Sequence, residues 1–170
     1  MKKIRYGMFE TNSSSTHTII VTDNATEPGN LVDFAIGEFG WERDTLCTID
    51  EKASYLYTMA CYCRNEDVYP ILHDMLSMYG VECSCSVPAR FKQYKDYDYL
   101  DNGYVDHGTD GDAYEFVDRM LSDEYALIKF LFSDESFIIT GNDNCEEFEY
   151  DEMKRAANVD YPHTTYYKGN

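Results

Sequence analysis

TIDEKASYLYTMACYC, residues 48–63, is the stretch that decides the fold. Thr48 and Glu51 have the spacing of a capping box, in which each side chain binds the backbone N–H of the other at the start of a helix. Apolar residues then recur at helical spacing and share one face: Leu56, Met59, Ala60 and Cys63. The segment therefore predicts a long helix with one face in the core.

Strands are predicted on both sides of this helix. Residues 3–9 and 17–22 are rich in apolar and β-branched types, as are residues 136–140, and residues 81–87 alternate apolar with polar. Residues 31–41 are compatible with a strand or with an irregular apolar segment. Asn102-Gly103 is a favoured type I′ turn pair, and it predicts a hairpin between residues 99–100 and 104–105.

Further helices are predicted at residues 68–79, with Asp67 as cap and Gly80 at the end, and after Asp112 and Ser122 as caps. An acidic helix is expected at residues 146–157. Strands interrupted by helices indicate an α+β fold. We expect a single domain, residues 1–160, with a mostly antiparallel sheet and two to four helices, followed by a C-terminal tail, residues 161–170.

The bulk composition excludes several classes of protein. Apolar residues make up 44% of the 170, enough for a core, yet no apolar run reaches membrane length and none follows the first lysines as in a signal peptide. We therefore expect a cytoplasmic protein with reduced thiols. The Cys-x-Cys pairs at 61–63 and 83–85 suggest zinc, but zinc pairs are usually spaced more widely. Buried thiols, with no metal or cofactor, are the better interpretation.

The negative charge is large and uneven. The chain has 32 acidic and 14 basic residues, a net charge of −18, and residues 96–170 hold 19 of the acids but only five of the bases. Such a field repels nucleic acid and attracts basic surfaces. Solubility alone would also account for it.

Three polar stretches each follow apolar residues, so each is expected at the end of a strand, where a sheet can hold functional groups. They are residues 10–17, 105–109 and 140–144. If they converge, they form one site. Its hydroxyls and turn amides can hold an anion, a histidine beside a carboxylate can act as a general base, and its acids can bind a divalent cation. Ordinary turn formation explains the same residues.

The stretch RYGMFETNSSSTHTI, residues 5–19, resembles the N-terminal signature of a family of uncharacterised proteins from phages and mobile elements. GYVDH, residues 103–107, and SFIITGNDN, residues 136–144, resemble its later blocks. The resemblance implies a phage or plasmid setting inside a host bacterial cell, where accessory proteins resemble counter-defence factors such as anti-CRISPR proteins. It implies no catalytic residues.

The first functional hypothesis is an anti-CRISPR-like inhibitor. Its acidic surface would mimic nucleic acid and dock on a basic, nucleic-acid-handling host defence enzyme, such as a CRISPR effector, without binding nucleic acid or membrane itself. Tyrosines among the charges would anchor the interface. The expected partner-binding residues are Asp96, Asp98, Asp101, Asp110, Asp112, Glu146, Glu147 and Glu149.

The second hypothesis is a small hydrolase or nuclease acting on RNA, such as guide RNA, or on nucleotides. His17 and His107 would act as general acid and base, and Glu10 and Asp106 would orient them. Phosphate or another ligand would be held by polar side chains of the three stretches: Asn12, Ser13, Ser14, Ser15, Asn142, Asp143 and Asn144. The sequence leaves open whether the protein is an enzyme, and it favours the inhibitor through its charge asymmetry.

Overall fold

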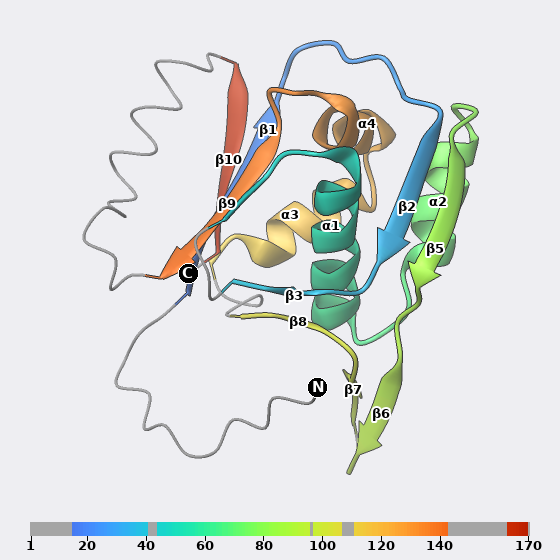
Figure 1. Ribbon diagram of the computed structural model, residues 1–170, viewed down its shortest axis with the longest axis vertical. Helices are drawn as coiled ribbons and strands as arrows, with labels where there is room; N and C mark the ends of the chain where they lie inside the picture. The colour runs from blue at the N-terminus through green and yellow to red at the C-terminus, as the bar shows by residue number, and fades with distance from the viewer. Residues whose placement is uncertain (1–14, 41–43, 96, 107–110, 143–162, 170) are drawn as a thin grey trace.

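Helix α1 (Ile49–Arg64) lies at the centre of the fold (Figure 1). The computed structural model describes residues 15–40, 44–95, 97–106, 111–142 and 163–169. The predicted capping box is present, because Thr48 Oγ1 accepts a hydrogen bond from Glu51 N and the Glu51 carboxylate accepts one from Thr48 N. The predicted apolar face is buried, and so are Tyr55 and Tyr57. The helix is therefore packed on more sides than its sequence pattern indicates.

A four-stranded antiparallel sheet flanks α1 on one side. Its strands lie in the order β10 (Thr164–Gly169), β1 (Ser15–Thr22), β9 (Phe137–Asn142) and β4 (Asp44–Leu46). Every residue of β1 is buried, and Ile19 pairs with Ile138 on one neighbour and Tyr167 on the other. Residues 161–170, which we expected to form a tail, instead contribute the edge strand β10. This strand pairs with β1, which lies near the other end of the sequence, so no local sequence pattern indicates the pairing.

A parallel pair of strands lies on the opposite side of α1, with α2 beside it (Figure 1). It consists of β2 (Leu31–Ala35) and β5 (Glu82–Val87). Phe34 of β2 is fully buried, and its ring contacts those of Tyr57 and Tyr69 edge-on. The apolar segment at 31–41 therefore forms a strand in its first half and continues into β3 (Glu38–Phe39).

The hairpin predicted at Asn102-Gly103 is wrong. Strand β7 (Tyr97–Leu100) pairs with β6 (Phe91–Tyr94), whereas β8 (Tyr104–Val105) runs parallel to β3. The Asn102 side chain binds the backbone of Pro88 and Arg90, and Gly103 lacks the positive φ of a type I′ turn. A Cβ at Gly103 would overlap with Ile36 Cγ2 and the Gly37 carbonyl oxygen. Gly103 therefore serves a close approach of two backbones.

Three further helices are α2 (Tyr69–Ser77), α3 (Ala113–Met120) and α4 (Glu124–Phe132). The N-cap of α2 is Val68, not Asp67 as predicted, and Asp67, one residue earlier, accepts a hydrogen bond from Tyr69 N through its Oδ1. The cap of α4 is Asp123, which binds Ala126 N, while the Ser122 hydroxyl donates to the Asp118 carbonyl instead. With four described helices and mostly antiparallel strands, the α+β fold is confirmed. The helix expected at 146–157 lies outside the described residues.

A buried lysine joins α1 to the end of α4. The Lys52 side chain is 1% exposed, and its Nζ donates to the carbonyl oxygens of Ser133 and Ser136 at 2.8 and 3.0 Å. Ser133 is the C-cap of α4, where carbonyls lack partners within the helix, and the amine supplies a donor there and a second one to Ser136, just before β9. Burial lowers the pKa of Lys52 to about 8, against the opposing effect of the Asp134 carboxylate.

The buried thiols of α1 predict a loss of stability in alkali. Burial raises the pKa of Cys61 to about 12 and that of Cys63 to about 11, from 9.0 for an unperturbed thiol. The unfolded chain therefore loses these protons first, and their contribution is complete below pH 9 and lost as the pH rises through 11 to 12. We expect the free energy of unfolding to fall by up to about 1.4 kcal/mol per pH unit for each thiol between pH ~9 and ~11.

The decrease in the free energy of unfolding per pH unit is measured by urea unfolding between pH ~9 and ~11. The proteins compared are the natural chain and the double variant Cys61→Ala/Cys63→Ala. The double variant should show a shallower decline. Cys47→Ala, which removes an exposed thiol, should keep the natural slope. Equal slopes in all three proteins would contradict the assignment.

Candidate functional site

A buried polar cluster forms where the described parts of the three polar stretches meet. Ser15 and His17 lie on β1, and Asp106 directly follows β8. The Ser15 hydroxyl donates to the Asp106 carboxylate, and His17 Nε2 lies 2.7 Å from the Asp106 carbonyl oxygen. On the third stretch, Asn142 of β9 pairs with Ser15 through the backbone. The sequence left open whether the three stretches converge, and their described parts do meet.

The hydrogen-bond partners of His17 indicate which tautomer its neutral ring adopts. A carbonyl oxygen only accepts, so Nε2 carries a hydrogen and donates it to Asp106. In the neutral ring, Nδ1 then accepts from the Tyr55 hydroxyl, 3.0 Å away. Tyr55 is itself fully buried, and that burial raises its pKa well above 10. The single basic lone pair of a neutral His17 is therefore already used.

Gly40 closes the cluster on another side. Its φ is +120°, and a Cβ built on it would lie 2.8 Å from His17 Cε1 and Nε2 and 3.0 Å from Asp106 Cβ. His17 is 0% exposed. A general base must reach its substrate directly or through one water, and this ring is enclosed. The geometry favours a structural role for Ser15, His17 and Asp106, in which the cluster ties β1 to the β8 segment.

Sequence reasoning missed Gly40 and Tyr55 as members of this cluster. Tyr55 occurs within an apolar helix pattern, and Gly40 within an apolar run, so neither gave a signal of its own. The remaining predicted site residues lie outside the described part of the chain: Glu10, Asn12, Ser13, Ser14, His107, Asp143 and Asn144. Their roles stay predictions.

Three of the eight carboxylates predicted to bind a partner lie in the described part of the chain. Asp98 is exposed on β7, but Asp101 binds Lys92 at 2.5 Å, and the Asp112 carboxylate accepts a hydrogen bond from Lys168 N at 3.1 Å. The other five predicted residues are not described: Asp96, Asp110, Glu146, Glu147 and Glu149. Two of the three described carboxylates therefore have contacts within the fold.

Tyrosines and carboxylates also occur together on α3 and the first turn of α4, all of them exposed except Glu124, which is half-buried. We call these residues the α3–α4 surface: Tyr114, Glu115, Asp118, Glu124 and Tyr125. The two tyrosines are 48% and 67% exposed. Spacings of three and four residues place the α3 members on neighbouring positions of one helix face. The sequence does indicate this surface, because both tyrosines lie within residues 96–170, the acidic part of the chain.

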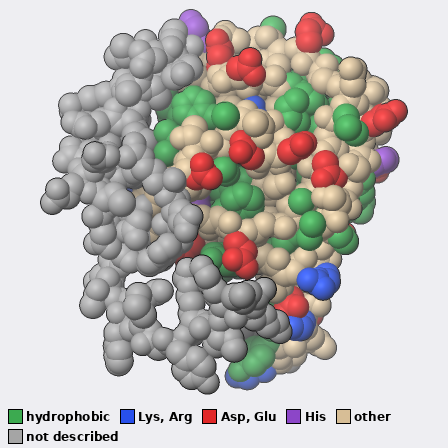
Figure 2. All heavy atoms as spheres, in the orientation of Figure 1, with side chains coloured by type: hydrophobic (Ala, Val, Ile, Leu, Met, Phe, Trp, Pro, Cys, Tyr) green, Lys and Arg blue, Asp and Glu red, His purple; other side chains and the backbone are tan. Residues whose placement is uncertain are grey.

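Exposed lysine and arginine side chains are concentrated in one region of the face in Figure 2. Acidic side chains are spread over the face in Figure 2, whereas lysine and arginine gather at its lower end, where Figure 1 places β6 and β7. Three cations follow closely in that region, Arg90, Lys92 and Lys95, and all are exposed. Over residues 90–101 these three cations are matched by three carboxylates, Asp96, Asp98 and Asp101, so this region is neutral on an otherwise acidic protein.

Protein-family models, curated proteins and solved structures give no significant match to this chain. The resemblance to phage and mobile-element proteins therefore stays a prediction, and residues 5–14 of its first block lie outside the described ranges. Within those ranges, no helix has the length and apolar character needed to cross a membrane. The described histidine, cysteine and carboxylate side chains form no group of three that could hold a metal ion.

Proposed function

We propose that the protein acts by binding, and that its acidic surface docks on the basic nucleic-acid-binding surface of a partner. The observation that carries this proposal is the uncompensated negative charge. The chain has a net charge of −18, and several described cations are already engaged. Lys52 is buried, and Arg64 contacts Asp118 at 2.6 Å, so Glu115 is the α3 carboxylate of the α3–α4 surface that this arginine leaves unneutralised. Carboxylates in such excess compete with phosphates for a basic channel.

The α3–α4 surface supplies the side chains that a specific interface needs. Tyrosine buries a large area at low entropic cost and is common among residues that dominate binding energy. Exposed carboxylates around it speed association and fix orientation. Solubility alone explains acidic residues, but it does not explain two exposed tyrosines among them.

In the phage setting that the resemblance implies, the partner is a host defence enzyme that handles nucleic acid, and the protein is a counter-defence inhibitor. The hydrolase alternative has less support, because its proposed base, His17, is enclosed and hydrogen-bonded on both ring nitrogens. It now depends on residues outside the described ranges, above all His107 and Glu10.

The proposal is tested by purifying the tagged protein from bacteria with active defence systems and identifying the bound protein and RNA. We expect a stoichiometric basic partner whose affinity falls at least about tenfold between about 0.15 M and about 1 M salt, as the screening length shrinks from about 8 to about 3 Å. Tight binding that ignored salt would contradict the proposal. Shortened RNA without a stable partner would support the hydrolase.

A charge reversal on the α3–α4 surface makes the test specific. Glu115→Lys should weaken binding at least about tenfold, because like charges face each other across the interface. The matched control is Glu82→Lys on β5, which changes the net charge equally at another exposed position. An equal loss in both variants would show that only the overall charge acts.

A further inference from the structure

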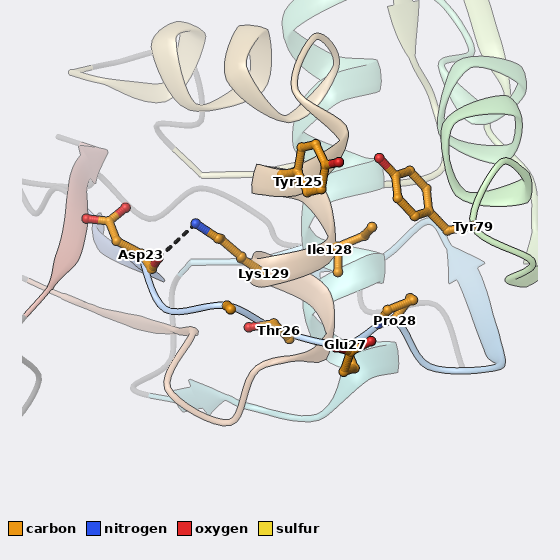
Figure 3. A pocket seen from close by; sticks show the side chains of 9 residues that line it. Asp23, Thr26, Glu27, Pro28, Tyr79, Tyr125, Ile128 and Lys129 are labelled. Atoms are coloured by element: carbon orange, nitrogen blue, oxygen red, sulfur yellow. Dashed lines mark hydrogen bonds between the residues drawn. The ribbon is translucent and has the colours of Figure 1, made fainter.

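A pocket of about 530 Å³ lies between the loop at residues 23–28, Tyr79 and α4 (Figure 3). Its walls are mainly apolar and include Ala25, Pro28 and Ile128. Two tyrosine rings form one end, Tyr79 and Tyr125, with centroids 5.9 Å apart and planes at 72°. A volume of this size holds a large side chain or a small ligand.

The tyrosine end of the pocket is suited to a cation. The faces of the Tyr79 and Tyr125 rings attract cations, and Tyr125 is 67% exposed and therefore accessible. The pKa of Tyr79 is raised, first by desolvation and then by the Tyr125 hydroxyl and the carboxylates of Glu124 and Asp123. Both of these carboxylates lie at the start of α4, beside Tyr125.

Glu27 supplies a carboxylate on the pocket lining. It is exposed and, among the described residues, it has no hydrogen bond or ion pair, in contrast to Asp23, whose carboxylate contacts Arg119 at 3.8 Å. Lys129 also lines the pocket, but its amine donates to the Asp23 carbonyl at 2.8 Å and points away from the tyrosines in Figure 3. Its positive charge is thus held at the opposite end.

We propose that this pocket receives an arginine side chain of the basic partner, with the guanidinium against the tyrosine rings and paired with Glu27. This inference rests on the proposed function and names the recognition element of the partner. Arginine fits better than lysine, because its planar guanidinium stacks on aromatic rings and binds a carboxylate through two parallel hydrogen bonds. Its aliphatic stem matches the apolar walls.

The direct test uses a short acetylated peptide with one central arginine, added to ¹⁵N-labelled protein and followed by amide chemical shifts. We expect shifts confined to residues 23–29, 79 and 124–129, and none from the same peptide with citrulline, which has the same shape without the charge. Tyr125→Ala and Glu27→Gln should each weaken binding about fivefold. The matched control, Tyr62→Ala, removes an exposed tyrosine of α1 outside the pocket and should bind the peptide as the natural protein does.

Two results would overturn the inference: equal shifts from the citrulline peptide, or unchanged binding in both pocket variants whose circular dichroism shows that they are folded. Binding of the captured partner to the two pocket variants distinguishes a failure of this inference from a failure of the proposed function. A salt-sensitive partner that binds Tyr125→Ala and Glu27→Gln normally removes the pocket and leaves the inhibitor proposal intact. Arginine binding in the pocket, without any basic partner, supports the pocket and removes the inhibitor.

Discussion

Gly40→Ala should lower the free energy of unfolding by about 4 kcal/mol, the largest effect that we expect from a single substitution. Part of the cost is backbone strain, since a φ of +120° is one that other residues rarely adopt. The other part is overlap of the new methyl group with His17 and Asp106. The ring cannot move aside easily, because the Tyr55 hydroxyl and the Asp106 carbonyl hold it on both nitrogens.

The measurement is urea unfolding at neutral pH, with Gly80→Ala as the control. Gly80 also has a positive φ, +75°, but a Cβ there meets nothing within 4 Å. This variant should lose only about 1 kcal/mol, the cost of the backbone conformation alone. If the two variants lose the same stability, the His17 cluster is not closely packed against Gly40.

Gly103→Ala should cost about 3 kcal/mol for a different reason. The backbone of Gly103 has no positive φ, so alanine there brings no conformational strain. The new methyl group instead overlaps with Ile36 and the Gly37 carbonyl, which also accepts the Tyr104 N–H at 3.1 Å. The methyl group must therefore displace β3 from β8.

The sign of this effect tests the backbone contact. Without the overlap, replacing a glycine of ordinary φ by alanine stabilises a protein by about 0.4–1 kcal/mol, because it restricts the unfolded chain. A stabilised Gly103→Ala variant in thermal or urea unfolding would therefore contradict the close approach. Gly80→Ala serves again as the reference for an uncrowded glycine.

Features encoded by neighbouring residues were predictable. The Thr48–Glu51 capping box, the helix after it and the strand around Ile19 follow from spacing within a few residues. Strand β10 and the pairing of β3 with β8 were not, since each depends on a partner far away in the sequence. The hairpin prediction at Asn102-Gly103 failed for the same reason. This pair often forms a tight turn, but here Gly103 lies against residues 36 and 37, far away in the sequence.

The candidate site was predictable only in part. Polar residues at strand ends brought Ser15, His17 and Asp106 to attention, and they do lie together. Their enclosure by Gly40 and Tyr55 could not be foreseen, since it follows from packing rather than from residue type. The pocket likewise joins residues from a loop, a helix end and α4 that share no sequence pattern.

The place of β1 in the sheet has a consequence for biosynthesis. Its two neighbours, β9 and β10, come from the last part of the chain. The strand leaves the ribosome early and waits with its apolar residues unpaired until residues 137–169 have been made. Contacts between distant segments form slowly, and exposed strands aggregate in the meantime. Rapid, abundant expression should therefore depend on chaperones that shield this segment until translation is complete.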